Sequence, residues 1–84
     1  MRSPYERAQV GVAMIKRAVL EVLDEAGDSG LTNAAVGRSL GIYAGYAESG
    51  HVGHVSRAML GQLEHEGLVE QDTATKRWRL KAVT

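Results

Sequence analysis

Apolar residues recur at steps of three and four along the first third of the chain, which is the pattern of an amphipathic helix. Residues 3–6 read S-P-Y-E, a helix start with a capping serine, a proline at the first helical position and a capping-box glutamate. Gly27 is a natural stop, so we predict a long first helix that includes at least residues 12–26. Gly11 weakens it by about 1 kcal/mol relative to alanine and could bend it. The apolar stripe consists of Val12, Ile15, Val19, Val22, Leu23 and Ala26.

A second, shorter helix is predicted after the first. Thr32 is a good cap for a helix through about Leu40, and Gly41 ends it. Leu31, just before the cap, could form a strand of one or two residues. The segment 42–51 has no clear period and contains two glycines, so we expect a loop longer than the usual turn between such helices. The inner face of the second helix carries Ala35, Val36 and Leu40.

A third amphipathic helix is predicted over residues 53–66, closed by Gly67. Its inner arc carries Val55, Met59, Leu60 and Leu63, and its outward face carries His54, Arg57, Ala58, Gly61, Gln62 and His65. Such a face, with small residues for close approach and donors for base edges or phosphates, suits the DNA major groove. It is equally typical of the solvated side of any amphipathic helix.

The hydrophobic period changes to two near the end of the chain, which predicts a β-hairpin. Residues 76–82 alternate as a half-buried strand, 68–71 form its antiparallel partner, and 72–75 suit the turn. Trp78 lies on the apolar side and is expected in the core. That side carries Trp78, Leu80 and Ala82, and the other carries Arg77, Arg79 and Lys81.

These elements predict an α+β protein that is mainly α, with three helices and a C-terminal two-stranded hairpin. The 84 residues have room for a single domain over 1–84, with a core over about 12–82, although the sequence leaves open whether they are the whole protein. The absence of cysteine excludes disulfides, cysteine zinc sites and thiol nucleophiles. Neither a membrane span nor a signal peptide is apparent, so we expect a cytoplasmic protein.

Charge is balanced overall but unevenly placed. The net charge is +0, yet residues 73–84 hold four basic side chains and no acidic one, whereas acidic residues cluster over 21–28. Basic side chains on one strand face would lie about 6.6–7 Å apart, close to the phosphate spacing along a DNA strand. The competing interpretation is a solvated strand edge blocked by lysine and arginine. The basic residues are Lys76, Arg77, Arg79 and Lys81.

Other chemistry is weakly represented. His51 and His54, with Glu48 as a third ligand, suggest a metal site, but the H-x-x-H spacing lacks the context of a zinc hydrolase, so we expect no metal or other cofactor. Neither a phosphate-binding glycine loop nor a nucleophile elbow is present, and we expect no catalysis. Tyr43 and Tyr46 could stack on bases, and the sequence leaves their role open.

The junction between the third helix and the hairpin has a characteristic sequence. Residues 63–69 read L-E-H-E-G-L-V and residues 78–80 read W-R-L. Over about 12–82 the chain resembles the winged helix-turn-helix superfamily, which includes transcription regulators and accessory domains of restriction endonucleases. The long 42–51 connection and the single arginine on the third helix depart from the pattern. The resemblance implies that Ser56, Arg57, Gly61 and Gln62 face the DNA groove and that Arg77 and Arg79 face its backbone.

Two functions follow as expectations. The first is binding of double-stranded DNA, as a transcription regulator or as the targeting module of a larger protein, with the hairpin supplying most of the charge. The second is a protein-interaction or homodimerisation module, which the neutral net charge and the acidic end of the first helix favour. The expected DNA contacts are His51, His54, Ser56, Arg57, Gly61, Gln62, Lys76, Arg77, Arg79 and Lys81.

Overall fold

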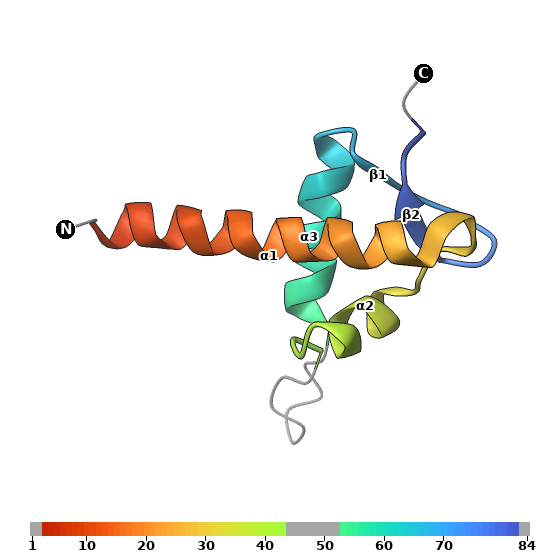
Figure 1. Ribbon diagram of the computed structural model, residues 1–84, viewed down its shortest axis with the longest axis horizontal. Helices are drawn as coiled ribbons and strands as arrows, with labels where there is room; N and C mark the ends of the chain where they lie inside the picture. The colour runs from red at the N-terminus through yellow and green to blue at the C-terminus, as the bar shows by residue number, and fades with distance from the viewer. Residues whose placement is uncertain (1–2, 44–52, 83–84) are drawn as a thin grey trace.

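Three helices are followed by a C-terminal hairpin, as the sequence predicts for a mainly helical α+β protein (Figure 1). The computed structural model describes residues 3–43 and 53–82. None of the helices in these ranges is long and apolar enough to span a membrane. The elements are α1 (Pro4–Ala26), a 3-10 turn (Gly27–Ser29), α2 (Asn33–Ser39), α3 (His54–His65), β1 (Val69–Gln71) and β2 (Trp78–Leu80).

The caps of the helices confirm the sequence prediction. The Ser3 hydroxyl accepts a bond from the Glu6 backbone N–H, and the Glu6 carboxylate accepts one from the Ser3 N–H, each at 3.2 Å. From this capping box α1 continues as one helix to its C-cap at Gly27, with no break at Gly11. Helix α2 begins after Thr32, whose hydroxyl accepts from the Ala35 N–H at 3.2 Å. Side-chain oxygens thus satisfy N–H groups that a helix start leaves without partners.

The end of α3 is fixed by its backbone. Gly67 adopts a φ of 79°, and its N–H donates to the Glu64 carbonyl at 3.0 Å. The Leu68 N–H donates to the Leu63 carbonyl, also at 3.0 Å. This pair of bonds is a Schellman motif, which favours glycine because the left-handed backbone crowds any Cβ. The motif turns the chain directly into β1.

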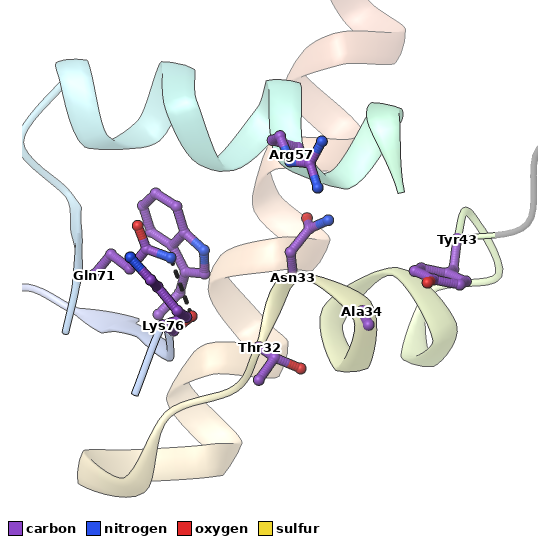
Figure 2. Close-up of a pocket in the computed structure, with 8 residues that line it drawn as sticks. Thr32, Asn33, Ala34, Tyr43, Arg57, Gln71 and Lys76 are labelled. Atoms are coloured by element: carbon purple, nitrogen blue, oxygen red, sulfur yellow. Dashed lines mark hydrogen bonds between the residues drawn. The ribbon is translucent and has the colours of Figure 1, made fainter. Parts of the chain in front are cut away.

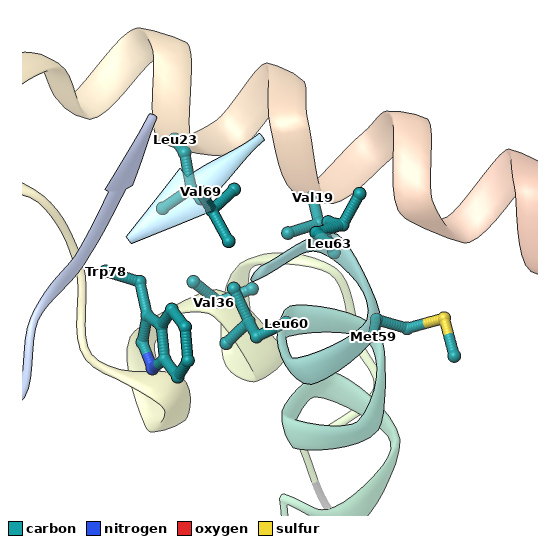
Figure 3. Packing of buried hydrophobic residues seen from close by; sticks show 8 residues of the cluster. All are labelled: Val19, Leu23, Val36, Met59, Leu60, Leu63, Val69 and Trp78. Atoms are coloured by element: carbon teal, nitrogen blue, oxygen red, sulfur yellow. The ribbon is translucent and has the colours of Figure 1, made fainter. Parts of the chain in front are cut away.

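The core lies where α1 crosses the other two helices and the hairpin (Figure 3). Full burial of one such aliphatic side chain contributes about 1.5–3 kcal/mol relative to exposure. The predicted α1 stripe reaches this core mainly through Val19 and Leu23, while its outer members are partly buried. The buried apolar residues are Val19, Leu23, Val36, Met59, Leu60, Leu63, Val69 and Trp78.

The hairpin is held on both sides of β2. On one side β2 pairs antiparallel with β1, so that Glu70 lies opposite Arg79 and Gln71 opposite Trp78. On the other side, Leu31 forms a single bridge with Trp78, with the Leu31 N–H donating to the Trp78 carbonyl at 2.8 Å and the Trp78 N–H donating to Leu31 at 2.6 Å. The strand predicted at Leu31 is therefore present as this bridge, which joins the α1–α2 connection to the hairpin.

The turn of the hairpin is organised by Asp72. Its carboxylate accepts bonds from the Thr75 N–H at 3.1 Å and the Ala74 N–H at 2.8 Å. These two donors favour the charged form and hold the pKa of Asp72 below its ordinary value, Thr75 having the larger effect. The Asp72–Thr75 turn that the sequence predicts is therefore an Asx turn with an ionised carboxylate.

Substitution at Gly30 tests the contact between the α1–α2 connection and β2. A Cβ at Gly30 would lie 2.5 Å from the Trp78 carbonyl oxygen, whereas one at Gly27 would meet nothing within 4 Å. The two glycines have nearly equal φ, 67° and 66°, so backbone strain is matched. We expect Gly30→Ala to lower the free energy of unfolding by about 1–3 kcal/mol more than Gly27→Ala, as overpacking does. Urea denaturation measures the difference, and equal losses in the two variants would contradict the contact.

Candidate nucleic-acid interface

A cleft of about 460 Å³ opens between the start of α2, one flank of α3 and the hairpin (Figure 2). Two cationic side chains, Arg57 from α3 and Lys76 from the hairpin loop, contribute to its walls, and no carboxylate does. Such a lining favours an anionic ligand. The lining residues are Thr32, Asn33, Ala34, Tyr43, Arg57, Gln71, Lys76 and Trp78.

One wall of the cleft is fixed by a polar junction between α2 and α3. The Asn33 side-chain amide donates to the Gly53 carbonyl at 3.1 Å, and the Ser56 hydroxyl donates to the Asn33 side-chain oxygen at 2.8 Å. A Cβ at Gly37 would lie 3.0 Å from the Ser56 hydroxyl oxygen, so the two helices approach closely here. Asn33, the first residue of α2, thereby binds the first turn of α3. This contact sets the position of Arg57 on α3.

This junction corrects the predicted orientation of α3. Ser56 is 0% exposed, so the expectation that it faces a DNA groove is wrong. Val55, expected in the core, is 46% exposed. The cause is the close contact between α2 and α3 at Gly37. The small side chain of Ser56 fits against this glycine and finds a hydrogen-bond partner in Asn33. The helix is therefore rotated toward Ser56.

The long connection between α2 and α3 is closed at its base. The Gly53 N–H donates to the Tyr43 carbonyl at 2.8 Å, so the chain leaves and rejoins the fold at neighbouring points. The connection therefore does not separate the two helices. The Tyr43 ring lies against Gly53 and carries the Arg38 guanidinium 4.4 Å from its centroid. Most of the predicted 42–51 loop lies outside the described residues, as do Glu48, His51 and Tyr46.

Arg57 and Lys76 face the cleft without a carboxylate partner in the described ranges. The two ion pairs found there join Lys16 to Glu66 and Arg79 to Glu70. Lys76 is held by its backbone, since the Gln71 side-chain amide donates to its carbonyl at 3.1 Å. Figure 2 shows this bond, with Arg57 on the neighbouring helix. Both cations are exposed and available to an external anion.

The basic strand face of the hairpin differs from the prediction. The Arg79 guanidinium contacts the Glu70 carboxylate at 2.8 and 2.9 Å, and Arg77 donates to the Gly30 carbonyl at 3.1 Å. These two arginines line a separate hollow together with Asp28 and Asp72. Residues 73–84 contain no acidic side chain, but carboxylates from earlier in the chain lie against this face. Glu70 was missed because it precedes the turn, and only the strand register brings it opposite Arg79.

The outward face of α3 is exposed as predicted, but one member alone reaches the cleft. Within the part of the chain that is described, Arg57 is the α3 residue that lines it. Lys81 follows β2, is exposed and lies outside the cleft lining. No group of three or more metal-binding side chains was found among the described residues. The exposed residues of this face are His54, Arg57, Ala58, Gly61, Gln62 and His65.

Several residues of the cleft were not singled out from the sequence as contacts. The sequence indicates Thr32 only as a helix cap and indicates no contact for Asn33 or Gln71. Their position in the predicted elements could have identified them. The first residues of α2 and the last residue of β1 border the cleft beside α3. The fold and the cleft thus define a small three-helix domain with a C-terminal hairpin and a cationic groove. Comparison with protein-family models, curated proteins and solved structures found no match.

Removing the Ser56 hydroxyl tests the α2–α3 junction. We expect Ser56→Ala to lower the free energy of unfolding by about 1–3 kcal/mol, because it leaves a partly buried amide oxygen of Asn33 without its donor. Ser39→Ala is the matched control, since Ser39 is exposed in α2 and should change stability by less than about 0.5 kcal/mol. Urea denaturation compares the two. Equal stability of both variants and the parent would show that the junction does not hold the helices.

Proposed function

We propose that this chain binds double-stranded DNA through the cleft between α2, α3 and the hairpin, as a cytoplasmic transcription regulator or as the targeting module of a larger protein. The observation that carries the proposal is the pair of cations, Arg57 and Lys76, which face one cleft from two elements without a carboxylate among the lining residues. The order of elements agrees with the resemblance to the winged helix-turn-helix superfamily, in which a helix and a hairpin contact the duplex together.

The dimensions of a duplex suit this arrangement. The DNA major groove is about 12 Å wide and admits a helix, while its phosphates are within reach of side chains beside that helix. Arg57 carries guanidinium donors for a base edge or a phosphate, and Lys76 carries an ammonium on the neighbouring loop. We therefore assign Arg57 to the groove and Lys76 to the adjacent phosphate backbone.

Small residues on α3 support a close approach to the duplex. Ala58 and Gly61 lie on the exposed face of the helix, and a Cβ at Gly61 would meet nothing within 4 Å. The protein's own packing therefore gives no reason for glycine at this position, where it costs the helix about 1 kcal/mol. Close approach of an external surface, such as a base-pair edge, would explain a glycine here.

The ion pairs of the hairpin limit how strongly affinity should depend on salt. With Arg79 bound to Glu70, the cleft offers two cations for phosphates. Lys76 on one phosphate gives a slope of about −0.9 in log affinity against log salt concentration, and a phosphate contact by Arg57 in addition would bring the slope to about −1.8. The affinity should then fall by at most about tenfold between about 50 and 200 mM salt. A strand face with three free cations would give a steeper dependence.

Single-charge substitutions test this assignment. We expect Arg57→Gln and Lys76→Gln each to weaken binding of a labelled duplex, and each to reduce the salt slope by about 1 where the residue contacts a phosphate. Arg79→Gln is the matched control, because it removes the same charge from the opposite face of the hairpin and should retain the parent salt slope. Fluorescence anisotropy at several salt concentrations measures affinity and slope, and thermal unfolding verifies that each variant is folded.

Two outcomes would contradict the proposal. If Arg79→Gln weakened binding as much as the cleft variants, the duplex would contact the other hairpin face. If the parent chain bound no duplex at about 50 mM salt, the alternative of a protein-interaction module would be favoured, since phosphate attraction is strongest there.

A further inference from the structure

The N-terminal part of α1 extends beyond the core of the molecule (Figure 1). Residues 3–10 are all exposed, and the fully buried side chains of α1 are those of Val19 and Leu23. These residues continue a helix of 23 residues, but most helical stability in proteins comes from packing, which this part of α1 lacks within one chain. The capping box at Ser3 stabilises the start, but it buries no apolar surface. This segment is therefore expected to gain stability from a partner.

An apolar stripe begins at the end of this segment and runs along the side of α1 turned away from the core. Val10 is 37% exposed and Met14 is 68% exposed, and Ala18 continues the same row at a spacing of four residues. These side chains border a shallow hollow that is lined by α1 residues alone. The lining residues are Val10, Ala13, Met14, Arg17, Ala18 and Glu21.

The charges at the two ends of this stripe are opposite in sign. Arg7 lies on the row before Val10, and Glu21 lies on it after Ala18. Two copies of α1 that cross antiparallel at Met14 bring Arg7 of each copy opposite Glu21 of the other. A parallel pair would instead bring like charges together, which is unfavourable.

We infer that a second copy of this chain covers the stripe, with the two α1 helices antiparallel about a two-fold axis at Met14. In this register Met14 meets Met14, Val10 meets Ala18, and each end is closed by an Arg7–Glu21 pair. A surface that is complementary to itself in this way is the requirement for an isologous two-fold interface. No residue of α1 lines the cationic cleft, so the dimer leaves that cleft open.

Charge reversal tests both the partner and the register. Sedimentation equilibrium of the full chain, without DNA, should give twice the chain mass of 9.0 kDa at high protein concentration. We expect Met14→Glu to raise the dimer dissociation constant at least about tenfold, as loss of a central contact does. Arg7→Glu and Glu21→Arg should each weaken the dimer, and the double variant should restore it. Asp24→Arg is the matched control, since it makes the same charge change on α1 away from the stripe and should leave the dimer intact.

The outcomes that overturn the inference are distinct from those for DNA binding. A parent chain that stays monomeric up to near-millimolar concentration excludes the dimer. A dimer that Met14→Glu leaves intact uses another surface, and failure of the double variant to restore association excludes this register. Circular dichroism of each variant verifies that α1 remains helical. A monomeric chain that still binds duplex would overturn the dimer inference and leave the DNA-binding proposal standing.

Discussion

The backbone pairing between Leu31 and Trp78 is the contact on which the arrangement of the molecule depends. The Trp78 backbone binds Leu31 on one side and lies opposite Gln71 on the other, and the residue is 7% exposed and packs in the core. One residue therefore joins the α1–α2 connection, the hairpin and the helices. Gly30 permits the approach, because any Cβ there would meet the Trp78 carbonyl. Without this contact the hairpin would keep its packing against α1 and α3 and the bond from Arg77 to the Gly30 carbonyl, but no backbone pairing would fix β2 to the α1–α2 connection.

The position of the hairpin decides what the charged residues can do. With Trp78 fixed, Gln71 and Lys76 stand beside the α3 flank that carries Arg57, and the cleft forms between them. On the opposite face, the same register places Glu70 against Arg79, and the Glu70 carboxylate neutralises the Arg79 guanidinium. A chain with no net charge thus concentrates two cations on one surface. The proposed DNA contact is therefore confined to the surface that carries these two cations.

Local signals made most of the fold predictable. The S-P-Y-E start, the glycine stops and the change of period near Trp78 each depend on residues close in sequence, and each element lies where they indicate. The rotation of α3 could not be predicted, because Ser56 is buried by a contact with α2 that sequence periodicity does not contain. The neutralisation of Arg79 depends on strand register for the same reason. Arg57 and Lys76 were both identified as candidates, but only the tertiary fold brings them to one cleft.

The central claim, that the cleft binds DNA, is tested most directly by mapping the contact residue by residue. Amide chemical-shift changes in a ¹⁵N-labelled chain, followed during titration with a short duplex at low salt, report which backbone groups sense the ligand. We predict the largest changes at Asn33, Arg57, Gln71 and Lys76, which border the cleft. Changes concentrated instead around Arg77 and Arg79, or the absence of any change at saturating duplex, would contradict the claim.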